Sequence, residues 1–86
     1  MMSRFSLQEL NRFRWRCRRG MAELDILLVP FFEDAFEALE AGQQTTFIGL
    51  LEEEDPVLWE WFSERSQPPG SEMLALVQLI LKRVRP

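Results

Sequence analysis

The stretch of this sequence that most suggests chemistry is residues 18–25, RRGMAELD. Arg18, Arg19, Glu23 and Asp25 could form charge-assisted hydrogen bonds with a partner, and Gly20 would let a partner's backbone approach closely. The charges also have a local explanation, because cations suit the end of one helix and Glu23 suits the start of the next. Asp25 lies beyond that first turn. Both readings, a binding surface and two helix ends, are therefore open.

The composition excludes most catalytic and metal chemistry. The chain has no histidine and a single cysteine, so it lacks Ser-His-Asp and Cys-His catalysis and the usual zinc sites. Its four glycines do not form a phosphate-binding or dinucleotide-binding motif. The acidic run at 52–55, EEED, lacks the ordered spacing of a calcium loop and reads as a solvated helix end. We expect no catalytic, metal-binding or cofactor-binding residues.

Charge is segregated along the chain. Residues 1–20 carry six arginines and one acid, residues 21–64 twelve acids and no base, and residues 65–86 four bases and one acid. The acidic middle argues against a nucleic-acid partner. We expect the basic ends to fold against it. Residues 12–20, RFRWRCRRG, interleave arginines with aromatics as some RNA-binding segments do. An amphipathic helix explains them better, with Leu10, Phe13 and Cys17 inward and Arg12, Arg16 and Arg19 on another side.

Length and cysteine content predict a small intracellular domain. A chain of 86 residues forms one domain with one core, of which we expect residues 1–5 and 85–86 to be frayed. A lone Cys17 allows no intrachain disulfide, suits a reducing compartment and is expected in the core. Arginines interrupt any N-terminal signal segment, and the longest apolar run, residues 26–32, is too short to cross a bilayer. We expect a soluble, cytoplasmic monomer without membrane insertion.

Apolar spacing and helix signals predict an all-α fold of about five short helices. Ser6 and Glu9 form a capping box for a first helix that runs to about Arg18, with Gly20 as a left-handed cap after it. A second helix starts near Met21, with a kink or break at Pro30. We expect its apolar run at residues 26–32, ILLVPFF, to be buried on most sides, and the helix to carry a core stripe of Leu24, Leu28, Phe31, Ala35 and Leu39.

Three further helices follow. Gly42 precedes a helix over about residues 43–52 with Phe47, Ile48 and Leu51 inward. Asp55 is expected to cap a fourth helix, with Pro56 in its first turn. Ser71 is expected to cap a fifth after the loop at 66–71. The inward residues of the fourth helix are Leu58, Trp61 and Phe62, and those of the fifth are Met73, Leu76, Val77, Ile80 and Val84.

Three segments resemble one known family: WRCRRGMAELDILLVPFF (15–32), FIGLLEEEDPVLWEWF (47–62) and PPGSEMLALVQLI (68–80). They resemble the succinate dehydrogenase FAD assembly factor family, the SdhE-type proteins, also known as the antitoxin CptB, over about residues 11–81. The family's Arg-Gly-x-x-Glu hallmark is met by Arg19, Gly20 and Glu23. Residues 40–43, EAGQ, lack the Ser/Asp-rich cap common in relatives, which would affect stability more than function.

The resemblance implies a compact five-helix protein that is not an enzyme. It would bind the flavoprotein subunit of succinate dehydrogenase, and in some bacteria of fumarate reductase, and promote covalent attachment of FAD to a histidine of that subunit. Arg19 and Glu23 would bond to the flavoprotein, Gly20 would allow backbone contact, and Arg18, Met21 and Asp25 would flank them. FAD would be held by the partner. Replacing Arg19 or Glu23 by Ala should change stability by no more than about 1 kcal/mol, as for capping or exposed sites, yet strongly weaken flavoprotein binding.

Two other functions are open on the sequence. An antitoxin-like regulator that neutralises a protein partner would also be a binding protein and would share the same features. A small RNA-binding module would require the arginine-rich helix to be open and basic, with an RNA affinity that falls steeply with salt.

Overall fold

The computed structural model describes residues 3–84, and within them the chain is all-α. The elements are α1 (Leu7–Arg16), α2 (Ala22–Ala35), the 3₁₀ turn η1 (Phe36–Ala38), α3 (Ala41–Leu50), α4 (Asp55–Phe62) and α5 (Ser71–Val84). The predicted fold class and the predicted five helices are confirmed.

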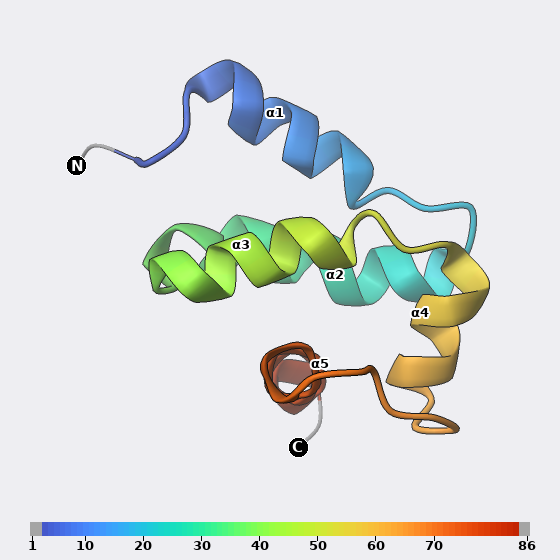
Figure 1. Ribbon diagram of the computed structural model, residues 1–86. Coiled ribbons are helices and arrows are strands. Elements are labelled where there is room, and N and C mark those ends of the chain that lie inside the picture. Colours follow the sequence, from blue (N-terminus) through green and yellow to red (C-terminus); the bar gives the residue numbers. More distant parts are fainter. Residues whose placement is uncertain (1–2, 85–86) are drawn as a thin grey trace.

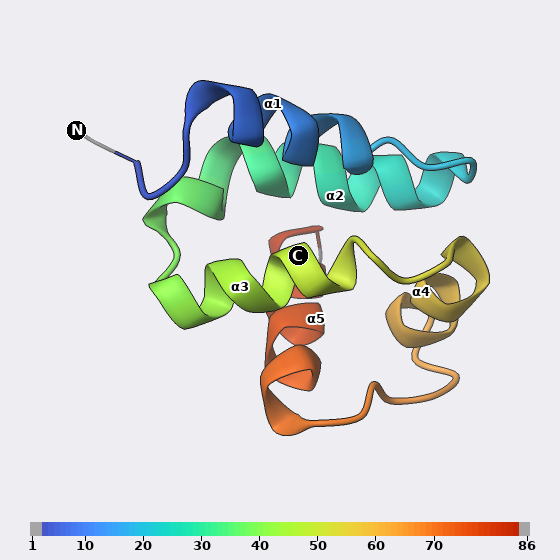
Figure 2. The same ribbon diagram turned by 45° about the horizontal axis from the view of Figure 1, so that its top comes forward.

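The helices pack around α2. Helix α1 runs alongside α2, α3 lies on another side of it, and α5 crosses beneath α3 at a steep angle (Figures 1 and 2). Helix α4 contacts both α2 and α5. In both views the segment that joins α1 to α2 comes close to the start of α4, although more than thirty residues separate them in sequence.

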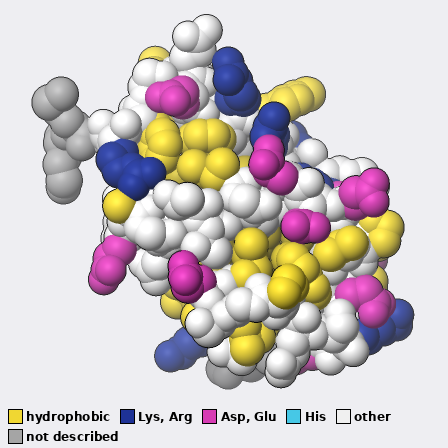
Figure 3. All heavy atoms as spheres, viewed as in Figure 1, with side chains coloured by type: hydrophobic (Ala, Val, Ile, Leu, Met, Phe, Trp, Pro, Cys, Tyr) yellow, Lys and Arg dark blue, Asp and Glu magenta, His cyan; other side chains and the backbone are white. Residues whose placement is uncertain are grey.

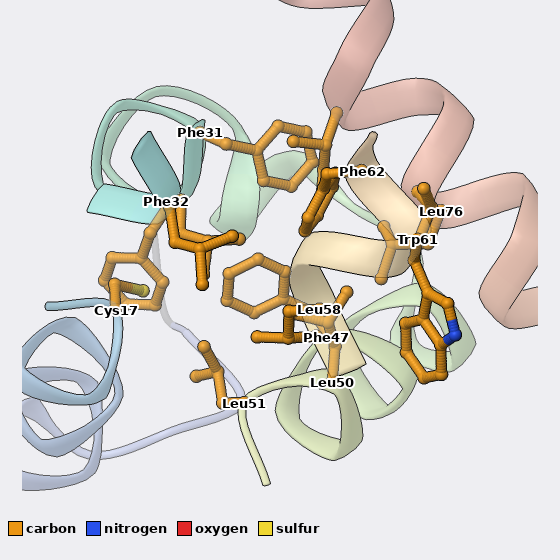
Figure 4. Packing of buried hydrophobic residues seen from close by; sticks show 14 of the residues in the cluster. Cys17, Phe31, Phe32, Phe47, Leu50, Leu51, Leu58, Trp61, Phe62 and Leu76 are labelled. Carbon is orange, nitrogen blue, oxygen red and sulfur yellow. The ribbon is translucent and has the colours of Figure 1, made fainter. Parts of the chain in front are cut away.

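The core is built mainly from aromatic and leucine side chains of α2, η1, α3, α4 and α5 (Figure 4). Helix α1 packs against it with the partly buried Leu10 and Phe13. Phe36, Phe47 and Leu58 are fully buried, and the Phe36 and Phe47 rings lie 5.6 Å apart. Cys17 is also fully buried, as predicted. The other buried apolar residues are Leu24, Leu28, Phe31, Phe32, Leu50, Leu51, Trp61, Phe62, Leu76, Val77, Ile80 and Leu81.

Helix α1 starts as predicted but ends earlier, and the residues that follow it do not have the predicted conformation. Ser6 and Glu9 form the expected capping box, with each backbone N–H bonded to the other's side chain. The last helical residue is Arg16, not Arg18. The prediction of a left-handed Gly20 is wrong, because Gly70 is the one glycine with a positive φ among the described residues. A hydrogen bond from its N–H to Asp55 Oδ2 holds Gly20 instead.

Helix α2 continues through Pro30, so the predicted alternative of a break is wrong. Pro30 lies on the exposed side of the helix, where its ring displaces no core side chain. The expectation that residues 26–32 are buried on most sides is confirmed only in part, since Ile26 and Pro30 are exposed. Ile26 is 65% exposed, whereas Leu24, Leu28 and Phe31 are buried.

The starts of the last three helices each shift by one or two residues. Helix α3 contains Gly42, and its first turn is closed by the Gln43 side chain, which accepts from the Glu40 N–H at 3.1 Å. Glu54 is the N-cap of α4, so the prediction that Asp55 is the cap is wrong. Ser71 is the first residue of α5. Val84, predicted inward, is 51% exposed because it lies at the helix end.

The N-terminal segment joins the core at Phe5. Its ring lies 5.2 Å from that of Phe13 and 5.8 Å from that of Phe36. Residues 1–5 and 85–86 were predicted to be frayed. Of these, residues 1–2 and 85–86 lie outside the described residues.

Candidate functional site

The Arg19 guanidinium is the centre of the corner between α1 and α2. Its Nε donates to Asp55 Oδ1 at 2.8 Å, and its Nη1 donates to the backbone carbonyls of Arg16 at 3.1 Å and Leu51 at 2.9 Å. Its Nη2 donates to the carbonyl of Glu53. The side chain is only 12% exposed. The expectation of an exposed Arg19 is therefore wrong: four of its five N–H donors are used within the chain.

Two carboxylates hold the backbone of this corner. The N–H of Arg19 donates to Asp25 Oδ1, and the N–H of Gly20 donates to Asp55 Oδ2 at 3.0 Å. A Cβ on Gly20 would lie 3.3 Å from that same Oδ2. The absence of a side chain at Gly20 thus allows the close approach of α4, without any unusual backbone angle.

The six residues proposed for partner binding lie in one corner but differ in what they can reach. Arg18, Gly20 and Glu23 are exposed. Met21 and Asp25 are half-buried, Met21 as the N-cap residue of α2 and Asp25 through its bond to the Arg19 backbone. The structure therefore separates an outer set that a partner can touch from inner residues that fix the shape of the corner. Arg19 and Asp25 belong to the inner residues.

Sequence reasoning missed two residues of this region. Asp55 was assigned to a helix cap, but its carboxylate binds Arg19 and Gly20. No pattern along the sequence could have paired residues 35 or 36 positions apart. Ile26 was read as part of a buried run, yet it lies three residues after Glu23 on the exposed side of α2. Ile26 lies outside the stripe of Leu24, Leu28 and Phe31, and this position could have predicted its exposure.

The segregated charges meet as predicted. Each ion pair between described residues joins a basic end segment to the acidic middle: Arg16–Glu52, Arg19–Asp55, Arg65–Glu60 and Arg83–Asp34. Figure 3 shows basic side chains along α1 and acidic ones below it, toward the connection from α3 to α4. Arg19–Asp55 is the most buried of the four pairs, so it has the most influence on structure.

The outer face of α1 remains open. Trp15 is 74% exposed, and Arg12 and Arg16 beside it are also exposed. Trp59 is half-buried and Trp61 is buried, so both pack within the fold. Trp15 is the exception, because its position on α1 is opposite to Leu10, Phe13 and Cys17, which face the core.

Other chemistry is sparse in the described part of the chain. Burial raises the pKa of the Cys17 thiol to about 12, which keeps it protonated and unreactive at neutral pH. Residues 3–84 hold no cluster of three or more acids or cysteines that could bind a metal, and no helix among them could cross a membrane. An open hollow of about 770 Å³ lies between α1, the end of α2 and the start of α3, and none of the six predicted residues lines it.

Comparison with known proteins shows the family to which the chain belongs. Residues 11–84 match the family described as flavinator of succinate dehydrogenase. The chain is 45% identical over 78 residues to the FAD assembly factor SdhE of Pseudomonas aeruginosa, covering 91% of this chain and 93% of the relative. It is 47% identical over 74 residues to that of Colwellia psychrerythraea, covering 86% and 81%. For the Vibrio cholerae protein the identity is 36% over 77 residues, 90% of each chain. This chain belongs to the family of succinate dehydrogenase flavinators, the FAD assembly factors.

Proposed function

We propose that this protein binds the flavoprotein subunit of succinate dehydrogenase and promotes covalent attachment of FAD to it. The observation that carries the proposal is the corner of residues 18–23 in a member of the assembly factor family: a fixed backbone turn with Arg18, Gly20 and Glu23 exposed. The protein acts as a monomer in the cytoplasm, and the flavoprotein of fumarate reductase is a second partner.

The corner suits protein recognition because it is already ordered. Arg19 and Asp55 fix the backbone from inside, so a partner would not have to order it on binding. Glu23 and Arg18 offer opposite charges on the two sides of Gly20, and the flavoprotein groups facing them should carry the complementary charges. Ile26, 65% exposed and one helical turn from Glu23, extends the surface with an apolar contact.

The chemistry of flavinylation would belong to the flavoprotein. This chain has no histidine to accept the flavin and no phosphate-binding motif to hold FAD. It would act by holding the flavoprotein in the geometry in which that subunit's own histidine attacks the flavin, and such positioning can supply a large part of a rate enhancement.

Reconstitution with purified apo-flavoprotein, FAD and this protein tests the proposal. Covalent FAD is read by in-gel flavin fluorescence after denaturation. We expect faster flavinylation with the wild type, loss of that gain with Glu23→Ala, and no change with Glu33→Ala, a matched exposed acid on the same helix. Equal rates with and without the wild-type protein would refute the proposal. Repeating the assay with the fumarate reductase flavoprotein tests the second partner.

Calorimetry with FAD alone tests the cofactor assignment. We expect no binding, or weak binding, to this protein. Tight, stoichiometric binding would make it a flavin carrier instead.

The alternative functions give different outcomes. An antitoxin-like regulator would retain a small toxin, not a large flavoprotein, in a pull-down from its host. An RNA-binding module is favoured by the open face of α1, where Trp15 is flanked by Arg12 and Arg16. It would show an RNA affinity that falls steeply with salt and is lost in Trp15→Ala.

A further inference from the structure

We infer that Asp55 is a positioning residue for the flavoprotein contact, acting on the corner of residues 18–23 from the start of α4. The inference rests on the proposed function and adds to it a residue outside the Arg-Gly-x-x-Glu motif. Asp55 touches two consecutive residues of that motif: its Oδ1 accepts from Arg19 Nε at 2.8 Å, and its Oδ2 accepts from the Gly20 N–H at 3.0 Å.

The carboxylate is not needed by its own helix as a cap. Glu54 is the N-cap of α4, and Pro56 follows in the first turn without an N–H of its own. Asp55 is in the first turn, where a negative charge is favourable, but no hydrogen bond to its own helix occupies its oxygens in the described structure. Both of its oxygens are directed to the motif, so its influence is on the corner.

The corner has a second, independent support. Arg19 also donates to the carbonyls of Leu51 and Glu53, in the turn between α3 and α4. If Asp55 is changed, these bonds still hold Arg19 against that turn, and the core beneath is untouched. The Gly20 N–H, however, loses the carboxylate oxygen that accepts its hydrogen bond. Loss of Asp55 should therefore change the shape and rigidity of the Gly20 backbone more than it changes the fold.

The consequence for recognition follows from where the exposed groups lie. Gly20 and Glu23 face solvent on the same corner whose inner side Asp55 holds. A partner that contacts both needs them in one fixed arrangement, since a mobile backbone would have to be ordered on binding. Asp55 supplies that arrangement without itself being part of the outer surface, since its side chain is 29% exposed and both oxygens are bonded.

The test compares Asp55→Asn with Glu52→Gln. The first variant keeps the shape but removes the charge, and its single neutral oxygen must serve the two N–H donors of Arg19 and Gly20. The hydrogen bond to the Gly20 N–H is therefore either lost or weakened. The second variant removes an exposed acid in the same connection, paired with Arg16 at 3.4 Å. Affinity for purified apo-flavoprotein is measured by calorimetry at a temperature at which circular dichroism shows every variant to be folded. We expect Asp55→Asn to weaken binding about tenfold and Glu52→Gln to leave it unchanged.

A double-mutant cycle separates positioning from general destabilisation. In a Glu23→Ala background the outer contact is already lost, so Asp55→Asn should cause little further loss of affinity if it acts through that surface. The amide of Gly20 should exchange its hydrogen faster in Asp55→Asn, while core amides keep their protection.

Three results would overturn the inference: unchanged binding by Asp55→Asn, an equal loss in the wild-type and Glu23→Ala backgrounds, or unchanged exchange at Gly20. Failure of the proposed function is distinguishable, because the wild-type protein itself would then not bind the flavoprotein.

Discussion

The Nε atom of Arg19 lies 2.8 Å from Oδ1 of Asp55, and this ion pair ties the segment between the first two helices to the first residue of the fourth. Both side chains are largely shielded from solvent, with 12% and 29% of their surfaces exposed. Within the Arg-Gly-x-x-Glu motif, Arg19 therefore holds the shape of the corner, whereas Gly20 and Glu23 are exposed and accessible to a partner. This division makes predictions that differ from those of an exposed charge cluster.

Arg19 and Glu23 should separate in their effects on stability. Arg19→Ala removes the donor to Asp55 Oδ1 and to three backbone carbonyls, so it should lower the free energy of unfolding by about 2–4 kcal/mol. Glu23→Ala removes an exposed side chain and should change it by less than about 0.5 kcal/mol. Urea unfolding followed by circular dichroism measures both. Equal, small effects would mean that the Arg19 contacts contribute little in solution.

Gly20 should respond to substitution because of Asp55, not because of its backbone angle. The Cβ of Gly20→Ala would meet Asp55 Oδ2 at 3.3 Å, and Arg19 restrains that carboxylate from moving, so the cost should be about 1 kcal/mol. Gly20→Arg should cost similar stability but abolish flavoprotein binding, since it also fills the outer contact space. Thermal melts and co-purification with apo-flavoprotein measure the two effects. Binding retained by Gly20→Arg would remove this corner from the interface.

Ile26 should contribute to binding without contributing to the fold. Ile26→Ser should change the free energy of unfolding by less than about 0.5 kcal/mol relative to the wild type. It should weaken flavoprotein affinity about tenfold. Leu7→Ser is the matched control, because Leu7 is 74% exposed but lies at the start of α1, distant in the fold from the corner. The same calorimetric titration applies to both variants. A loss of affinity in Leu7→Ser as large as that in Ile26→Ser would show that the apolar contact is not specific to α2.

Cys17 should make stability fall at high pH. Burial raises the pKa of its thiol from 9.0 to about 12, so above pH 9 the unfolded chain loses a proton that the folded chain retains. Stability is unaffected by this group below pH 9 and decreases between pH 9 and 12, by at most about 1.4 kcal/mol per pH unit for one proton. Urea unfolding across this range measures the slope.

Cys17→Ala should be less stable overall, because it leaves a small cavity, but should lose the thiol's part of this slope. If the slope is the same in wild type and Cys17→Ala, the thiol is not its source.

The sequence alone determined the helical architecture, because it depends on local signals. The capping box of Ser6 and Glu9 and the three- and four-residue spacing of Leu24, Leu28 and Phe31 are readable without any tertiary contact. The opposite charges of the ends and the middle likewise indicated which segments would meet. The motif residues 18–25 could also be located, through their resemblance to a family.

The roles within that motif were decided only by the tertiary structure. From the sequence, Arg19 and Glu23 are both charged residues of the motif with the same expected role. In the structure Arg19 donates to the carbonyls of residues 51 and 53 and to the carboxylate of residue 55, whereas Glu23 faces solvent. Similarly, the sequence around Asp55 is that of a helix cap. In the folded protein its carboxylate instead accepts a hydrogen bond from the Gly20 N–H. The physical reason is that a charged side chain takes whichever donors or acceptors the packing of the helices brings within about 3 Å. At separations of more than thirty residues, local sequence carries no information about which groups those are.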